Sequence, residues 1–207
     1  MSTHTITSLK GLRAVYRLPG DSAVKKVLPH LDKHCVNFIS LSPFCVLSTS
    51  RAKGSVDASP KGGDPGFVQV RDAKTLLLPD WPGNNRLDSL ENIMENPHVG
   101  MMFFVPGIDE TLRINGRALL STDPSLRADF SIDNKLPISV LIITVEESYL
   151  HCARAIWRAD LWNSDNYVDR KLLPSMGQML ADQIKGYDGV SADKMMADHR
   201  NKLYSLD

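Results

Sequence analysis

Cysteine is scarce in this sequence, and its placement excludes two common structural roles. Cys35, Cys45 and Cys152 are the only three cysteines in 207 residues, and they lie far apart. A disulfide framework needs more cysteines at closer spacing, and a structural zinc site usually contains a CxxC pair, which is absent. We therefore expect neither a disulfide-stabilised fold nor a metal site.

The sequence also lacks net charge and long apolar runs. Lysine plus arginine equals aspartate plus glutamate at 24 each, so bulk electrostatic binding to nucleic acid or to a membrane surface is not expected. No stretch approaches the ~20 apolar residues that span a bilayer, and the amino terminus has no apolar signal-peptide core. We therefore expect a cytoplasmic protein with no nucleic-acid and no membrane partner.

What the chain does contain fits one globular domain. It is 43% hydrophobic and 23% charged, values typical of folded soluble domains. We expect a single domain over 1–207, made of a helical amino-terminal cover over 1–41, a barrel over 42–152 and a helical and loop extension over 153–207.

Helical periodicity marks the amino-terminal region. Apolar residues three and four positions apart predict helices over 6–18 and 21–41,. Pro29 lies inside the second segment and is expected to kink or split it, because proline cannot donate the helical hydrogen bond.

A third helix is predicted over 86–97, ending before Pro97,. Asp88 is the expected N-cap, with Glu91 three residues later completing a capping box. The expected apolar face consists of Leu87, Leu90, Ile93 and Met94.

Short apolar runs separated by Gly, Pro, Lys or Asp predict a strand-rich middle of the chain. The predicted strands are 43–50, 54–59, 66–70, 74–80, 99–107, 111–121 and 138–150. This pattern is compatible with a small antiparallel barrel, whose closure removes exposed edges, and equally with an open antiparallel sheet flanked by helices.

A Pro-Gly-Asn-Asn turn leads from an apolar strand into the predicted helix 86–97. Helix amino termini carry unpaired N–H groups and partial positive charge, and they therefore suit anions. Arg86 adds a fork of donors that matches phosphate oxygens, and Asn84 and Asn85 add neutral donors. The alternative is an ordinary strand–turn–helix junction with a solvated arginine.

A second candidate lies in the stretch VDASPKGGDPGFV, residues 56–68. A strand carrying Asp57 and Ser59 runs into Pro-Lys-Gly-Gly, where glycine permits close backbone approach and Lys61 supplies a mobile positive charge. Alone, the stretch is typical of an exposed loop. Two basic, glycine-containing junctions close in sequence favour one shared phosphate pocket.

Together these motifs resemble the pyridoxamine 5'-phosphate oxidase-like family, and within it a flavoprotein subgroup. The resemblance follows the order LSTS, VDASPKGGDPGFV, LLLPDWPGNNRLDSLENIMENPHVGMMFFVPG and ETLRINGRA, spanning roughly 38–122, with a weaker match in 151–162. It implies a mainly β fold with helices: an antiparallel, Greek-key-like split barrel with flanking helices. It also implies a homodimer with FMN at the subunit interface.

The resemblance assigns one group of residues to the phosphate end of the cofactor. Ser59 and Lys61 would lie near the ribityl phosphate, and Asn85 and Arg86 would hold the phosphate itself. Asp80, at the end of its strand, would lie beside the ring system. The triplet Asn-Asn-Arg replaces the Ser-Arg-Lys of the true oxidases.

A second group is assigned to the flavin ring. Ser48 and Thr49 would flank the flavin or its ribityl chain. Thr111 occupies the place where the oxidases carry a glutamine, and Arg113 would reach the flavin from the partner subunit. No residue is assigned a catalytic role.

The carboxyl-terminal region departs from the oxidases, which end with a tryptophan and a downstream arginine. Trp157, Arg158 and Trp162 lie in this region at a different spacing, and the final arginine–histidine signature is missing. The resemblance therefore does not imply oxidation of vitamin B6.

The leading functional hypothesis is an FMN-dependent oxidoreductase acting on an unidentified small molecule, with the flavin carrying the redox chemistry. Two alternatives remain open. One is a flavin-binding or flavin-sensing protein without turnover. The other is the same barrel holding haem, with His151 or a nearby histidine as axial ligand, or a deazaflavin, which would need a long basic groove.

Overall fold

The computed structural model describes residues 4–200 and 202–204. The outermost residues of the predicted amino-terminal cover and carboxyl-terminal extension therefore lie outside the described chain. Within the described residues, no helix combines the length and apolar character needed to cross a bilayer.

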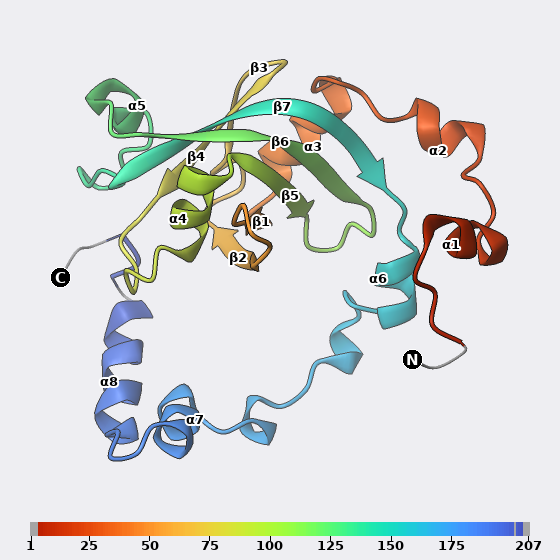
Figure 1. Ribbon diagram of the computed structural model, residues 1–207. Coiled ribbons are helices and arrows are strands. Elements are labelled where there is room, and N and C mark those ends of the chain that lie inside the picture. Colours follow the sequence, from red (N-terminus) through yellow and green to blue (C-terminus); the bar gives the residue numbers. More distant parts are fainter. Residues whose placement is uncertain (1–3, 201, 205–207) are drawn as a thin grey trace.

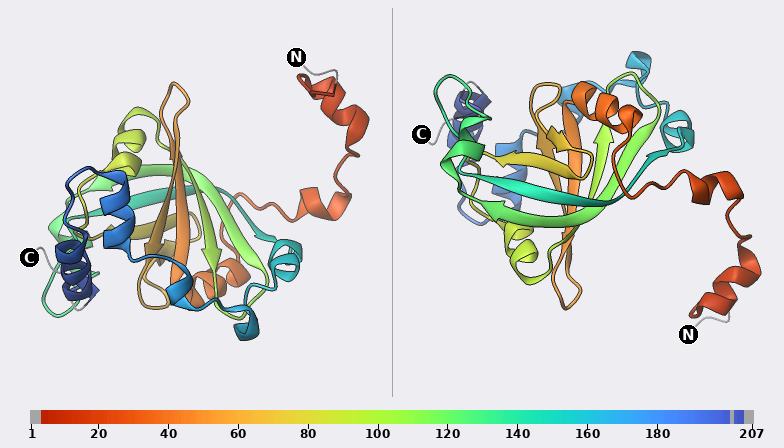
Figure 2. Two further views of the ribbon diagram at one scale, coloured as in Figure 1. Left: turned by 90° about the horizontal axis from the view of Figure 1, so that it is seen from below. Right: turned by 90° about the horizontal axis from the view of Figure 1, so that it is seen from above.

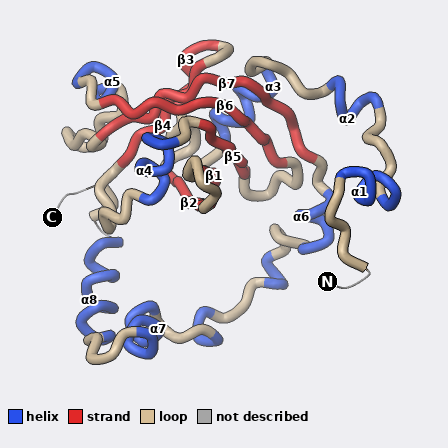
Figure 3. The backbone as a smooth tube through the Cα atoms, viewed as in Figure 1, coloured by secondary structure: helices blue, strands red, loops and turns tan. Residues whose placement is uncertain are grey.

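Seven antiparallel strands form one curved sheet in the order β2-β1-β5-β6-β7-β4-β3, with helices at its periphery (Figures 1 and 3). All seven strands expected from the sequence are present, with ends shifted by a few residues. The strands are β1 Phe44–Ser50, β2 Val56–Gly62, β3 Gln69–Asp72, β4 Thr75–Asp80, β5 His98–Phe104, β6 Thr111–Ser121 and β7 Ser139–His151.

The sheet order makes this a split barrel. Strands β5, β6 and β7 follow one another, and the preceding β4 returns beside β7, which is a Greek-key connection,. The long β6–β7 pair shifts register between Asn115 and Gly116, and such bulges bend and twist strands. Gly116 is required there, because a Cβ would lie 2.1 Å from the carbonyl oxygen of Thr144. The predicted mainly β split barrel with flanking helices is confirmed.

The inner face of the curved sheet forms the core. Along β1 the side chains alternate, so that Cys45 and Leu47 are fully buried inside while Phe44 lies on the outer face. Helix α3 (Lys33–Leu41) contributes Phe38 and Ile39 to the same core. Asp32 caps α3 by accepting hydrogen bonds from the first-turn N–H groups,.

The rest of the amino-terminal region differs from the predicted cover. The segment 21–41 is split at Pro29, as expected, into α2 (Asp21–Lys25) and α3. Helix α1 (Leu9–Val15) and α2 contain no buried residue, and Figure 2 shows them standing away from the sheet in both views. Among the helices of the described amino-terminal residues, α3 is the one that covers the barrel.

Helix α4 (Asp88–Glu95) corrects two details of the sequence prediction. Its N-cap is Leu87, with a left-handed φ of 56° and no capping side chain, so the predicted Asp88 cap and capping box are wrong. Asp88 is instead the first helical residue. The buried face contains Ile93 and Asn92, whereas Leu87 and Met94 of the predicted apolar face are exposed.

Two further regions complete the fold. Helix α5 (Pro124–Ala128) precedes Phe130, which packs with Leu77 and Val140 on the outer face of β4 and β7. The carboxyl-terminal extension then runs from one end of the sheet to the other (Figure 1). Its elements are α6 Arg154–Ala159, the 3-10 turns Ser164–Asn166 and Arg170–Leu172, α7 Met176–Gln183 and α8 Gly189–Arg200.

Candidate functional site

A cavity of about 540 Å³ lies between the edge strand β2, the end of β4 and the start of α4. Its volume is within the range of small-molecule sites, about 300–1,000 Å³. Five of the nine residues predicted to bind the cofactor line it: Ser59, Lys61, Asp80, Asn85 and Arg86.

Strand β2 brings its polar side chains to this cavity through its period of two. Ser59 and Lys61 lie opposite Leu47 and Cys45 of β1, which belong to the inner face. Asp57 follows the same alternation, so all three β2 side chains point to the inside of the barrel,. This spacing could have identified Asp57 as a third lining residue.

An ion pair crosses the opening of the barrel at the cavity. The Lys61 Nζ lies 3.0 Å from the Asp80 Oδ1, and the two side chains are 21% and 13% exposed. Since β2 is one edge of the sheet and β4 lies next to the other edge, this contact joins the two sides of the split barrel.

The turn before α4 is held in an unusual backbone conformation. Asn85 and Leu87 both have left-handed φ values, 58° and 56°, and the Asn84 side chain accepts the Arg86 N–H. The Arg86 guanidinium donates to Asp88 at 2.8 Å, and this contact raises the pKa of Arg86 above its ordinary value. No side chain caps α4, and its first residues, Asp88 and Ser89, line the cavity, so uncapped N–H groups lie beside it.

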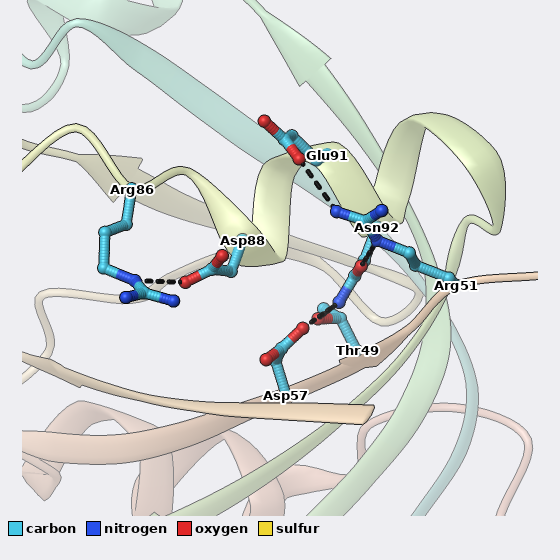
Figure 4. Close-up of polar contacts among 7 residues, drawn as sticks. All are labelled: Thr49, Arg51, Asp57, Arg86, Asp88, Glu91 and Asn92. Atoms are coloured by element: carbon cyan, nitrogen blue, oxygen red, sulfur yellow. Dashed lines mark hydrogen bonds and ion pairs between the residues drawn. The ribbon is translucent and has the colours of Figure 1, made fainter. Parts of the chain in front are cut away.

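Asn92 anchors α4 to the sheet in a buried network that the sequence analysis missed (Figure 4). Its Nδ2 donates to Asp57 at 2.6 Å and to Thr49 at 2.9 Å. Its Oδ1 accepts from Arg51, which also pairs with Glu91. Asn92 is fully buried, so the network fixes the position of the helix that forms one wall of the cavity.

Thr49 therefore lies inside this network rather than on the cavity surface, since it is 3% exposed and accepts from Asn92. The signal that could have found the network is the polar Asn92 directly before the apolar Ile93, on the helix face that packs on the strands. A buried asparagine requires several polar partners, and Thr49 and Asp57 supply them.

The remaining predicted residues lie on the outer face of the sheet. Ser48 is opposite Gly100, while Arg113 is opposite Tyr149 and close to its ring. Thr111 begins β6, and Leu120, near the end of the same strand, lines the cavity. The strand pairing places the start of β6 closer to β2: Leu112, next to Thr111, is joined through Phe103 and Cys45 to Lys61, three strand spacings or about 14 Å away,. Thr111 does not line the cavity and is 7% exposed.

The carboxyl-terminal tryptophans lie beside the start of β6. The Trp157 indole donates to Asp109 at 2.7 Å, and the Trp162 indole donates to the Ile108 carbonyl at 2.9 Å. They attach the extension to the loop between β5 and β6. His151 ends β7 at the same end, opposite Thr111.

The described part of the chain holds no cluster of three or more His, Cys, Asp or Glu side chains arranged for a metal ion. Burial raises the pKa of Cys45 to about 12, only partly opposed by the positive charge of Lys61. The Cys45 thiol is therefore a core group.

Comparison with known proteins gives structural similarities at low sequence identity. The chain is similar to HupZ of Group A Streptococcus (19% identity, 58% of this chain and 93% of that chain covered, TM-score 0.48). It is also similar to General Stress Protein 26 from Bacillus anthracis (17% identity, 55% of this chain and 88% of that chain covered, TM-score 0.42). A third similar structure is an FMN-binding protein from Syntrophomonas wolfei (12% identity, 56% of this chain and 81% of that chain covered, TM-score 0.43).

No curated protein sequence matches the chain. The family model described as pyridoxamine 5'-phosphate oxidase matches residues 31–152, which run from the start of α3 to just beyond the end of β7. Because that match covers more than half of the chain, the protein belongs to the pyridoxamine 5'-phosphate oxidase family.

Proposed function

We propose that the protein binds FMN in the cavity beside β2 and α4 and acts as a flavin-dependent oxidoreductase on a small molecule in the cytoplasm. The observation that carries this proposal is the convergence of Ser59, Lys61, Asp80, Asn85 and Arg86 on one cavity. FMN would supply the redox chemistry, and the protein would bind and orient it.

The donor set fits a phosphate group. Lys61 and Arg86 supply positive charge, and the amino terminus of α4 supplies backbone N–H groups without a side-chain cap,. Three carboxylates also line the cavity, but each already has a partner: Asp57 binds Asn92, Asp80 binds Lys61 and Asp88 binds Arg86.

The Arg86 contact is the one that phosphate would displace. The Arg86 side chain is 74% exposed and its partner Asp88 is only two residues away. Exposed ion pairs of this kind contribute little in water, whereas a phosphate accepts two parallel bonds from a guanidinium. Arg86 is therefore free to turn from Asp88 to the ligand at small cost.

The lining supports a flavin over haem. The described residues around the cavity include no histidine, cysteine, methionine or tyrosine, and His151, the candidate axial ligand, lies at the opposite end of β7. A deazaflavin would call for a longer basic surface than Lys61 and Arg86 supply, since Asp57, Asp80 and Asp88 share the same lining.

The proposal includes a homodimer with the cofactor at the subunit interface. Ser48, Thr111 and Arg113 lie on the outer face of β1, β5 and β6, where Phe44 and Phe104 place their rings 6.0 Å apart. Thr111 does not line its own cavity. In a two-fold dimer built on this face, the start of β6 in one subunit would meet the cavity of the other.

The test is FMN retention by Arg86→Met and Lys61→Met, with Arg71→Met as a matched control, because Arg71 is an exposed arginine on β3 outside the cavity. Wild type should retain FMN after desalting, with flavin absorbance near ~450 nm. Loss of a charge-assisted phosphate bond should weaken FMN affinity by about tenfold or more.

Arg71→Met should retain FMN as wild type does. Wild-type affinity in both cavity variants would overturn the assignment of this cavity. A wild-type protein that retains no added FMN would overturn the cofactor. Reduction of bound flavin by a nicotinamide donor would distinguish an oxidoreductase from a flavin-binding protein without turnover.

A further inference from the structure

We infer that the N-terminal arm, residues 6–26, docks on a second copy of this chain. The inference rests on the homodimer of the proposed function and adds to it a segment outside the barrel and outside the family match, which begins at residue 31.

The arm carries apolar side chains that the described part of its own chain does not bury. Neither α1 nor α2 contains a buried residue, and Figure 2 shows both helices clear of the barrel. Leu9 is 81% exposed, Leu18 78% and Val15 67%. A short amphipathic helix in water gains little from propensity alone, so its stability requires a surface that covers these side chains.

The accessible surface of the chain supports a partner of considerable size. A compact monomer of 23.0 kDa is expected to expose about 9,600 Å²,, and this chain exposes 14279 Å². The excess is roughly 4,700 Å² per chain, more than the roughly 1,000–2,500 Å² that each subunit of an obligate homodimer buries. Most of the exposed large apolar side chains lie in residues 6–24 and 157–203.

Charge makes a second copy a suitable partner. The first 26 residues contain five lysines and arginines and one aspartate, a charge of +4, and because the whole chain has no net charge, the remainder carries −4. The arm and the body of the molecule are thus opposite in charge. Such complementarity favours association in a defined orientation.

The arm joins the body of the molecule beside the outer face of β7. At this junction, Lys26 donates to the Leu150 carbonyl at 2.7 Å, and its ammonium lies 5.4 Å from the Tyr149 ring centre. Tyr149 is the cross-strand neighbour of Arg113 on the outer face. A second barrel that packed on that outer face would lie next to the point where the arm leaves the body. The arm would then extend over the surface of the second barrel.

The experiment combines molecular mass with brief trypsin digestion of the full chain over a dilution series. In the isolated chain Arg13 and Arg17 are exposed, and trypsin should cut after both. At concentrations where light scattering gives a dimer, cleavage at these sites should be at least about tenfold slower than in the diluted monomer, because docked segments must open before they are cut.

The variants are Leu9→Asp and, as a matched control, Met94→Asp on α4, where Met94 is 64% exposed and outside the cavity. Leu9 has no packing to lose in the monomer, so Leu9→Asp should fold normally. Burial of a leucine on the partner predicts a dimer dissociation constant raised about tenfold or more. The control should stay within about twofold.

The outcomes separate the arm from the dimer and from the cofactor. A dimer whose arm is cut at the monomer rate, or whose dissociation constant is unchanged by Leu9→Asp, overturns the docked arm and leaves the dimer standing. A monomer at every concentration overturns both, together with the interfacial position of the cofactor, whereas FMN retained by that monomer would keep the cavity assignment of the proposed function. Protection of the arm by phosphatidylserine vesicles, with the protein monomeric, overturns the second copy in favour of an anionic membrane surface.

Discussion

Replacing Asn92 with alanine tests whether the buried network beneath α4 holds the cavity wall in place. Asn92 donates to the Asp57 carboxylate at 2.6 Å and to the Thr49 hydroxyl at 2.9 Å, and it is fully buried. A bond to a charged group contributes about 1.5–3 kcal/mol and a neutral one about 0.5–1.5 kcal/mol. Asn92→Ala should therefore lower the free energy of unfolding by about 3 kcal/mol.

For a protein of this size that loss corresponds to a fall in Tm of about 6–12 °C. Thermal and urea unfolding of the apoprotein, followed by circular dichroism, measures it. Asn96→Ala is the control, because Asn96 makes a comparable bond to Ser50 at 3.0 Å at the other end of α4, where it is only half-buried. A loss in Asn92→Ala no greater than in Asn96→Ala would refute the anchoring role.

Three further predictions follow from single residues. In the native protein at pH 8, a thiol reagent should modify the exposed Cys152 at once and leave the buried Cys45 unmodified until the protein unfolds,. Burial raises the pKa of Cys45 to about 12, so its thiol stays protonated at this pH. Labelling of Cys45 at the same rate as Cys152 would contradict this. Asp32→Ala should cost about 1 kcal/mol as a lost N-cap. The bond from the Cys35 N–H lowers the pKa of Asp32. The stabilisation by this cap is therefore present above the ordinary aspartate pKa of about 4 and disappears as pH falls through the lowered pKa. Urea unfolding of wild type and variant at pH 7 and at pH 2.5 would show the difference. Gly116→Ala would place a Cβ 2.1 Å from a β7 carbonyl oxygen, so the bulge should be lost and soluble expression should fall far below that of Gly100→Ala, where the nearest atom is 3.5 Å away.

The strands were predictable because their signal is local. Each is a short apolar run ended by Gly, Pro or charged residues, and the observed ends differ by only a few positions, as in 66–70 against β3 at Gln69–Asp72. Periodicity could not choose between a barrel and an open sheet, since that depends on strand order and on the bulge at Gly116. The family resemblance supplied the split barrel.

The errors have a common physical cause, which is that tertiary contacts outweighed local preference. Asp88 has the composition of an N-cap, but a left-handed Leu87 starts the helix, and Asp88 pairs with Arg86 instead. Met94 fits the apolar spacing of a helix face, yet Asn92 takes the buried position because Asp57 and Thr49 satisfy its amide.

The two basic residues of the cavity have different places in the fold, and this difference bears on how an anion would be held. The pair of Lys61 with Asp80 is largely buried and joins the two sides of the barrel, so separating it would open the split as well as expose a charge. An ammonium has three N–H donors, and only one is used by Asp80. Lys61 can therefore contact a phosphate while keeping its bond across the opening, whereas Arg86, exposed and paired within its own turn, must change partner. The cavity thus combines a fixed positive charge that belongs to the barrel with a mobile one that belongs to the turn before α4.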